Sequence, residues 1–344
     1  MKKINWGIIG LGNIANIFSE AFLNSNKGKL LAISSHNKSK LEKFKNKFKI
    51  EDKYVFKNYN DLIECNEVDV VYITLPNNLH YEWIMKCIKK NKKIFIEKPA
   101  FIDFKSAKNV NEEIKKKNLF FSEGFMYRFY PQIAKIIEII KSNEMGKLIS
   151  MESVYGVNLL YKKKFFIFNK KKKINPNNRL FNKKLGGGCI FDLGCYPASF
   201  SLLIASLRKD INYKNFKLIN IKKKIGITDV DIESEAEIFF DNKFKSKIKV
   251  SFESEFGNKS TINFEKGKLI IEDTWQGKGK LIQIFLKKKN IINFDINKNI
   301  YSYEIEQVSE SIQKNNSECL YPGMTMAETL LNTQILENWL NAKK

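Results

Sequence analysis

The chain opens with a short apolar run that ends in a glycine-rich turn, and this turn constrains the fold more than any other feature. Residues 4–9 precede Gly10, Gly12 and Ala15, which give the pattern G-x-G-x-x-A. Apolar residues at helical spacing follow at 17, 18, 21 and 22. This layout predicts a dinucleotide-binding turn, because Gly10 allows the tight bend and Gly12 lets the backbone approach a pyrophosphate. An ordinary strand-to-helix turn is the alternative.

Strand and helix patterns alternate over the first third of the chain. Strands are expected at 4–9, 29–34, 68–74, 93–96 and 119–122, and helices at 13–24, 39–48, 81–90 and 103–117. Such alternation predicts a doubly wound parallel sheet of the Rossmann type, with helices on both faces. The first domain, expected to bind a dinucleotide, therefore covers residues 1–123.

The pattern changes after residue 123. A helix at 131–141 is followed by strands at 147–155, 216–223, 231–240, 243–252, 259–264, 268–272 and 281–287. Successive alternating strands with short connections predict a large, mostly antiparallel open sheet packed on helices, so residues 124–344 are expected to form an α+β domain. A helix at 325–342 is expected to pack back on the body of the protein.

The charge of the chain raises the question of a nucleic-acid partner. The formal net charge is +23, which is typical of nucleic-acid binders. However, the lysines accompany many Asn, Ile and Phe residues along the whole chain, as expected from an A- and T-rich genome. The densest lysine run, 162–173, is interpreted as a solvated loop. We expect no nucleic acid partner, although a nucleic-acid-binding protein stays a third hypothesis, which predicts salt-dependent binding.

Cysteine and histidine usage argues against a metal centre. The five cysteines show no paired-ligand spacing and the chain has two histidines, so no zinc site is expected. The N-terminus does not resemble a signal peptide, and no segment is expected to span a membrane. These observations predict a reduced, soluble, cytoplasmic protein with no membrane partner.

The loop after the second expected strand bears on cofactor choice. An acidic residue normally binds the ribose 2′-hydroxyl at this place. This loop instead carries Ser35, His36 and Lys38, and the nearest acid is Glu42. Hydroxyl, imidazole and ammonium groups are compatible with a 2′-phosphate, which favours NADP over NAD. The alternative is that these are ordinary loop residues.

Two further segments follow expected strands, and with them the chain resembles a known family. Thr74 and Pro76-Asn77-Asn78-Leu79-His80 follow the 68–74 strand, and Glu97-Lys98-Pro99 follows the 93–96 strand. Together with the glycine turn, these motifs resemble the glucose-fructose oxidoreductase and inositol dehydrogenase family of NAD(P)-dependent enzymes, in order and in spacing. The resemblance continues at 123–131, 179–181 and 186–197, which look most like the branch of dihydrodiol dehydrogenase and xylose dehydrogenase.

The resemblance implies roles for three side chains. Lys98 matches the catalytic lysine of the family, and a half-buried lysine beside a cofactor can handle a proton or polarise a carbonyl oxygen. Asp192 and Tyr196 match a D-x-x-x-Y arrangement of this branch, with Tyr196 as proton donor or acceptor and Asp192 as its support. The alternatives are a surface lysine at 98 and a core tyrosine at 196.

The remaining candidates fall on cofactor and substrate positions of the resemblance. Arg128 and Arg179 bind substrate, or each forms a structural ion pair, and the sequence does not choose between these. The expected cofactor-binding residues are Gly10, Gly12, Asn13, Ile14, Ser35, His36, Lys38, Thr74, Pro76, Asn77, His80 and Glu97. Within this set, His80 is expected to position the nicotinamide ribose.

The sequence therefore predicts an NADP-preferring oxidoreductase, with NAD possible, that transfers hydride to or from a secondary alcohol or the anomeric carbon of a sugar or polyol. A homodimer or homotetramer is expected. Two alternatives stay open: an oxidoreductase acting on nucleotide-linked sugars in glycan synthesis, and a non-catalytic NAD(P)-binding sensor.

Overall fold

A computed structural model describes residues 2–164, 168–296 and 299–342 of the chain. The chain divides into two compact units. Unit 1 consists of Met1–Tyr130 and Ile296–Leu330, and unit 2 consists of Pro131–Asp295 and Leu331–Lys344. Each unit is described by itself below.

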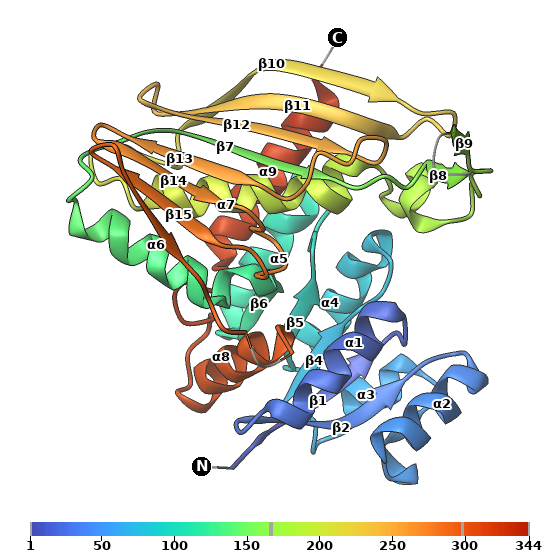
Figure 1. Ribbon diagram of the computed structural model, residues 1–344. Helices are drawn as coiled ribbons and strands as arrows, with labels where there is room; N and C mark the ends of the chain where they lie inside the picture. The colour runs from blue at the N-terminus through green and yellow to red at the C-terminus, as the bar shows by residue number, and fades with distance from the viewer. Residues whose placement is uncertain (1, 165–167, 297–298, 343–344) are drawn as a thin grey trace. The chain divides into compact units, whose positions relative to one another are not determined.

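Unit 1 is built on a parallel sheet with the strand order β3-β2-β1-β4-β5-β6 (Figure 1). Chain order reverses between β1 and β4, which makes this point the topological switch where α/β sheets bind ligands. The strands are β1 (Ile4–Ile9), β2 (Gly28–Ser34), β3 (Val55–Phe56), β4 (Val70–Ile73), β5 (Lys93–Glu97) and β6 (Phe121–Gly124). The expected Rossmann sheet is confirmed.

Helices follow the strands of unit 1 and end on recognisable signals. Asn37 and Asp103 cap the starts of α2 and α5 by accepting the backbone N–H groups of Lys40 and Ser106. The helices are α1 (Asn13–Ala21), α2 (Lys38–Phe48), α3 (Tyr59–Glu64), α4 (His80–Lys89), α5 (Phe104–Lys117) and α8 (Tyr301–Gln313). The sequence analysis missed α3, β3 and α8.

The core of unit 1 centres on Trp6 of β1, which is fully buried. Its ring packs against Phe18 at 5.6 Å and Phe95 at 5.4 Å between centroids. The indole N–H donates to the Ser309 hydroxyl of α8 at 3.0 Å. An aromatic cluster of this size and geometry stabilises the sheet-to-helix packing well beyond its buried area.

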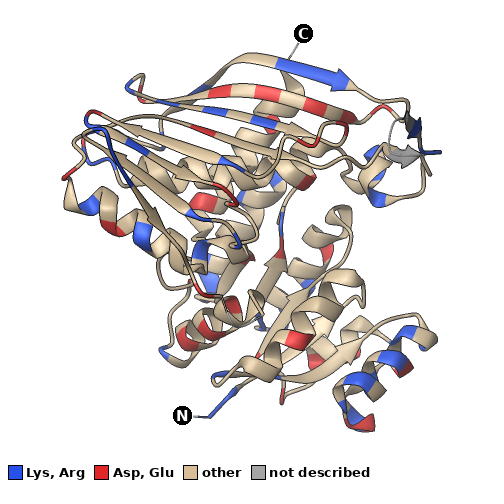
Figure 2. Ribbon diagram, in the orientation of Figure 1, with Lys and Arg blue, Asp and Glu red and all other residues tan. Residues whose placement is uncertain are grey.

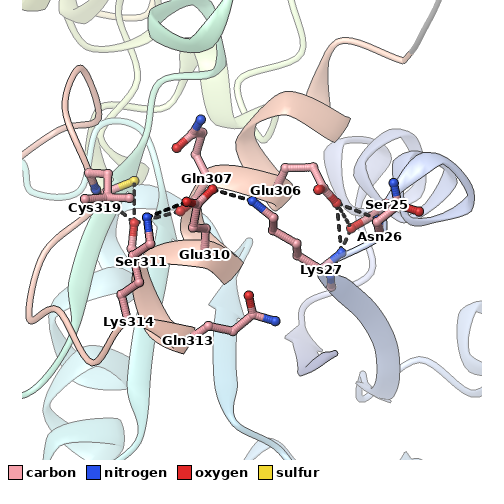
Figure 3. A network of polar contacts seen from close by, with 12 residues as sticks. Ser25, Asn26, Lys27, Glu306, Gln307, Glu310, Ser311, Gln313, Lys314 and Cys319 are labelled. Carbon is pink, nitrogen blue, oxygen red and sulfur yellow. Dashed lines mark hydrogen bonds and ion pairs between the residues drawn. The ribbon is translucent and has the colours of Figure 1, made fainter. Parts of the chain in front are cut away.

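Helix α8 packs on α1, β1 and β2, so it belongs to unit 1 although the sequence analysis placed all of 124–344 in one domain. A polar network attaches it to the turn before β2 (Figure 3). One Glu306 carboxylate oxygen accepts the Ser25 hydroxyl at 2.5 Å, the Asn26 N–H at 2.6 Å and the Lys27 N–H at 3.0 Å. Beside it, Glu310 forms an ion pair with Lys27.

Unit 2 is built on a second sheet with the order β10-β11-β12-β7-β13-β14-β15-β16. All neighbouring strands in it are antiparallel except β12 and β7, which run parallel. The strands are β7 (Leu148–Gly156), β10 (Phe216–Ile225), β11 (Asp231–Phe240), β12 (Phe244–Ser251), β13 (Ser260–Phe264), β14 (Gly267–Ile271), β15 (Leu281–Phe285) and β16 (Lys288–Ile292). The expected mostly antiparallel open sheet is confirmed.

One face of this sheet is buried and the other carries charge. Buried and less buried residues alternate along β11, and α7 (Cys195–Ser206) contacts β7 and β12. Helix α6 (Pro131–Ser142) covers the same face (Figure 1). On the other face the acidic side chains of β11 lie between lysines of β10 and β12 (Figure 2), as in the Lys222–Glu235 pair at 2.7 Å. Ion pairs of this exposed kind add little stability.

Two segments of unit 2 bear on the sequence analysis, which expected no membrane span and a solvated loop at 162–173. The stretch Lys183–Ser206 is long and apolar enough to cross a membrane by length and composition, yet 94% of its most apolar window is buried inside the fold. It is therefore a core helix. Part of the lysine-rich segment 162–173, expected as a loop, forms the antiparallel pair β8 (Tyr161–Lys164) and β9 (Phe168–Lys171), while residues 165–167 lie outside the described residues.

The last helix, α9 (Met326–Asn341), was expected at 325–342. Its residues up to Leu330 count with unit 1 and the rest with unit 2. In unit 2, the Trp339 indole N–H donates to the Ser234 hydroxyl of β11 at 2.8 Å. This buried bond ties the end of the helix to the large sheet.

Candidate active site

The glycine-rich turn leaves open space at the start of α1. Gly10 has φ +88°, and a Cβ there would press on Leu75 and on the Thr74 carbonyl. Gly12, the residue before α1, is different, because a Cβ added to it would meet no described atom within 4 Å. No described side chain caps the helix at this end. The start of α1 therefore has no described side-chain cap and a residue before it with room beside it, which fits a phosphate.

The loop after β2 brings together the side chains expected near a ribose. Ser35 is buried, whereas His36 and Lys38 are exposed. The His36 ring packs on Tyr59 at 4.3 Å between centroids, and its Nδ1 lies 3.1 Å from the Lys57 carbonyl oxygen. Exposed imidazole and ammonium groups at this loop can donate hydrogen bonds to an anionic group.

His80 links the loop after β4 to the loop after β5. The ring is 1% exposed. Its Nε2 lies 2.8 Å from the Leu75 carbonyl oxygen and its Nδ1 lies 3.0 Å from the Pro99 carbonyl oxygen. A neutral imidazole donates through one nitrogen, and an imidazolium donates through both. His80 therefore binds backbone on both sides, whereas Asn77 is the buried side chain of the short 3₁₀ turn before it.

Lys98 directly follows β5 and is half-buried. Because β1, β4 and β5 are adjacent parallel strands, Lys98, Thr74 and Gly10 leave the sheet at the same edge. The Lys98–Pro99 peptide bond is cis. Just before it, Glu97 accepts a hydrogen bond from the buried Tyr72 hydroxyl. Burial, followed by the charge of Glu97, raises the pKa of Tyr72 well above its usual range.

The backbone after Lys98 is held by a residue that the sequence analysis did not single out. The N–H of Ala100 donates to one Glu123 carboxylate oxygen at 2.9 Å, and the Thr329 hydroxyl donates to the other at 2.9 Å. Glu123 is 3% exposed. The sequence did carry a signal for Glu123, because this acidic residue stands in the largely apolar segment 119–125. Acidic residues are rarely buried without a partner.

Arg128 is also buried in unit 1, at 1% exposure. Its Nη1 donates to the Glu328 carboxylate at 2.9 Å and to the Pro322 carbonyl oxygen at 3.1 Å. Of the two alternatives left open by the sequence, this geometry supports the structural ion pair.

In unit 2, a second glycine-rich turn sets the position of the aspartate and tyrosine. Gly188 has φ +114°, and a Cβ there would collide with the Asp231 carboxylate. Asp231 is buried and accepts the Ile190 N–H at 2.6 Å. Burial raises the pKa of Asp231. The sequence analysis missed Asp231, because it lies 41 positions from Ile190, whose N–H it accepts, and begins an ordinary strand.

Asp192 lies within a π-helical turn, Ile190–Gly194, that leads directly into α7. Such turns often occur at functional sites. The Asp192 carboxylate accepts a hydrogen bond from the Arg179 guanidinium at 3.2 Å, and the Arg179 side chain is half exposed. Tyr196 is 6% exposed and packs against Tyr155 at 5.4 Å and Trp275 at 5.7 Å between ring centroids. Pro197 lies in α7, three residues after the π-helical turn.

The candidates therefore form two groups. Unit 1 gathers the glycine turn, the His36 loop, His80, Glu97 and Lys98 at or near one edge of its sheet. Unit 2 brings Arg179, Asp192 and Tyr196 to one π-helical turn and the helix that continues it.

Comparisons with known proteins identify the family of the chain. Residues 4–125 match the family model described as "Oxidoreductase family, NAD-binding Rossmann fold", and residues 133–270 match the one described as "GFO/IDH/MocA C-terminal domain". The trans-1,2-dihydrobenzene-1,2-diol dehydrogenase of Xenopus tropicalis is 24% identical over 97% of this chain and 96% of its own length.

Two further proteins extend the comparison. The D-xylose 1-dehydrogenase (NADP(+)) of Hypocrea jecorina is 26% identical over 57% of this chain, which aligns with about half of that enzyme's length, 52%. Among solved structures, a 3-ketoreductase from Actinomadura kijaniata in complex with NADP and TDP-benzene superposes with a TM-score of 0.81 at 18% identity, covering 98% of this chain and 97% of the other. At that identity the likeness shows the fold.

Proposed function

Since this chain belongs to the GFO/IDH/MocA family of NAD-binding oxidoreductases, we propose that it transfers hydride between NADP and a hydroxyl-bearing carbon of a sugar or polyol. The observation that carries the proposal is the shared sheet edge of unit 1, where open space at Gly12 and the half-buried Lys98 occur together. The bound nicotinamide supplies the hydride chemistry that amino-acid side chains lack.

The residues at this edge fit a dinucleotide. The turn and the first N–H groups of α1, from Gly10, Gly12, Asn13 and Ile14, would hold the pyrophosphate, because they offer an uncapped helix terminus without a side chain in the way. Ser35, His36 and Lys38 would hold the ribose 2′-phosphate, which favours NADP, with NAD as the weaker cofactor. Thr74, Pro76, Asn77, His80 and Glu97 would form the nicotinamide side.

We assign the proton to Lys98 and Tyr196. Oxidation of an alcohol releases the hydroxyl proton, and reduction returns one to the carbonyl oxygen. A side chain whose pKa lies near the working pH is best suited to accept and donate this proton. A phenol titrates far above neutrality by itself, and a neighbouring ammonium lowers that value. Lys98 and Tyr196 are each proposed to take part in this proton exchange, and Asp192, held by Arg179, is proposed to orient the substrate hydroxyls.

The proposed setting follows from smaller observations. None of the five cysteines is in a disulfide bond, which supports a reduced, cytoplasmic location. A homodimer or homotetramer is proposed. The substrate is a small molecule, and neither nucleic acid nor membrane is proposed as a partner.

One measurement separates the alternatives. The purified protein is incubated with NADP or NAD and with a panel of free and nucleotide-linked sugars and polyols, while nicotinamide absorbance is followed. We expect turnover of free sugars or polyols, with a higher kcat/KM for NADP. Turnover of nucleotide-linked sugars alone would favour the second candidate, for which the net charge of +23 offers an attraction to phosphates. Cofactor binding with no turnover across the panel would contradict the proposal and indicate a sensor.

A further inference from the structure

The backbone just after Lys98 contacts buried side chains from two other elements, and a third element holds one of them. His80, from the start of α4, lies against the Pro99 carbonyl oxygen at 3.0 Å and the Ala100 carbonyl oxygen at 3.3 Å. Glu123, from β6, accepts the Ala100 N–H at 2.9 Å. The same carboxylate accepts the hydroxyl of Thr329, from α9, at 2.9 Å. Both carboxylate oxygens of Glu123 are therefore used.

We propose that Glu123 is a positioning residue for Lys98, and that its carboxylate, through the Ala100 N–H, holds the loop in the geometry that proton transfer needs. The inference rests on the proposed role of Lys98. A hydrogen bond from a backbone N–H to an ionised carboxylate is shorter and about twice as strong as one to a neutral group. Protonation of Glu123 therefore loosens the loop without removing a side chain.

The surroundings of Glu123 make this protonation accessible near neutral pH. Burial raises the pKa of Glu123 to about 7, against the lowering effects of the Ala100 N–H, the Thr329 hydroxyl and the charge of Arg128. The charge of Glu97 adds to the rise. Arg128 is itself paired with Glu328, which limits its effect on Glu123. The carboxyl group thus changes charge near neutral pH.

The effect on stability has the opposite sign to the effect on catalysis. An unfolded glutamate titrates near 4.5, so the folded protein binds an extra proton between that value and about 7. Stability contributed by the protonated group is present below pH 4.5 and is lost as the pH rises through 7. Glu123→Gln removes this loss, so above pH 7 the variant is expected to be at least as stable as the wild type but less active. A residue with a merely structural role would lose both together.

The test compares wild type, Glu123→Gln and a matched control. Asp69→Asn is the control, because the Asp69 carboxylate also accepts a backbone N–H, that of Asn5, at 2.8 Å, but at the other end of the sheet. With selective ¹⁵N-alanine labelling, we expect the Ala100 amide resonance to titrate near pH 7 in wild type and in Asp69→Asn, and not in Glu123→Gln. An Ala100 resonance that does not titrate in wild type would overturn the proposal.

A second readout reports on Lys98 without any substrate. Amine labelling at a pH above 7 is quantified peptide by peptide by mass spectrometry, and exposed Lys105 serves as the internal reference. We expect Lys98 to label several-fold faster in Glu123→Gln than in wild type. Equal labelling of Lys98 in the two proteins would contradict the positioning role.

Turnover then separates this inference from the proposed function. The ratio of wild-type kcat to Glu123→Gln kcat is expected to be near one well below pH 7 and to reach about 10- to 100-fold well above it, the cost of a misplaced catalytic group. The KM for NADP is expected to be unchanged. A ratio that does not vary with pH would overturn the inference. A wild type that turns over no substrate, yet shows the Ala100 titration and the Lys98 labelling difference, would overturn the function and leave Glu123 as the residue that holds Lys98.

Discussion

The Asp231 carboxylate accepts the backbone N–H of Ile190 at 2.6 Å, which fixes the start of the π-helical turn that carries Asp192. This bond requires the carboxylate to lie where a side chain at Gly188 would otherwise project. The glycine-rich turn of unit 2 therefore makes room for Asp231. The candidate catalytic side chains of this unit come from the residues that follow the turn.

Replacement of Gly188 by alanine should lower the free energy of unfolding by more than the strain of a positive φ alone would. Gly188→Ala combines φ +114° with a collision against Asp231, whereas Gly257→Ala combines φ +82° with no described atom within 4 Å of the new Cβ. We expect the free energy of unfolding to fall by about 1–2 kcal/mol for Gly257→Ala and by about 3 kcal/mol or more for Gly188→Ala. Urea unfolding measures both. Equal losses would show that Asp231 does not constrain the turn.

The two glycines of the first turn should separate stability from cofactor binding. Gly12→Ala places a methyl group in open space, so stability should change by less than about 1 kcal/mol, while the affinity for NADP falls because the methyl group meets the pyrophosphate. Gly10→Ala, at φ +88° and against Leu75, should instead destabilise the fold. The measurements are NADP titration and thermal unfolding. Unchanged NADP affinity in Gly12→Ala would mean that the cofactor does not bind at this turn.

The two arginines left open by the sequence should also behave differently. Arg128→Met leaves Glu328 buried without its cation, and we expect a loss of about 3–5 kcal/mol in the free energy of unfolding. Arg179 is half exposed, so Arg179→Met should cost less than about 1 kcal/mol while raising the KM for substrate. A stable Arg128→Met protein with a raised KM would instead assign Arg128 to substrate binding.

Acid should weaken the attachment of α8. Hydrogen bonds from Lys27 and Lys314 lower the pKa of Glu310 to about 2, from an unfolded value near 4.5. The stability that the Glu310 carboxylate contributes is present above pH 4.5 and is lost as the pH falls toward 2. Glu310→Gln should therefore flatten the decline in melting temperature over this window, compared with wild type. Gln307→Ala, one turn away on the same helix (Figure 3), is the control that should keep the wild-type slope.

The sequence predicted most of the fold and the candidates in its motifs, because apolar periodicity and glycine positions are local signals. It missed α8 although Ile305, Val308 and Ile312 recur at helical spacing, because the helix also buries Ser302, Glu304 and Ser309 and so reads as largely polar. It also missed Glu123 and Asp231, because a buried carboxylate is recognised by its partners, and Ala100 and Ile190 become partners when the chain folds.

The same reasoning explains how Arg128 was left undecided. Its partner Glu328 lies 200 positions away in the chain, and a motif cannot show whether a guanidinium is already neutralised. By contrast, the tight bend at Gly10 was predicted from the sequence, since its φ of +88° lies in a region that glycine adopts without steric cost.

If Lys98 handles the proton of an alcohol-to-carbonyl conversion, Lys98→Met removes the group on which turnover depends. With a substrate identified from the panel, kcat and the NADP dissociation constant are measured for wild type, Lys98→Met and the surface control Lys105→Met. We expect kcat of Lys98→Met to fall by about 100-fold or more, with NADP binding and the Lys105→Met kcat close to wild type. A Lys98→Met enzyme that binds NADP normally and retains wild-type kcat would show that Lys98 does not handle the proton.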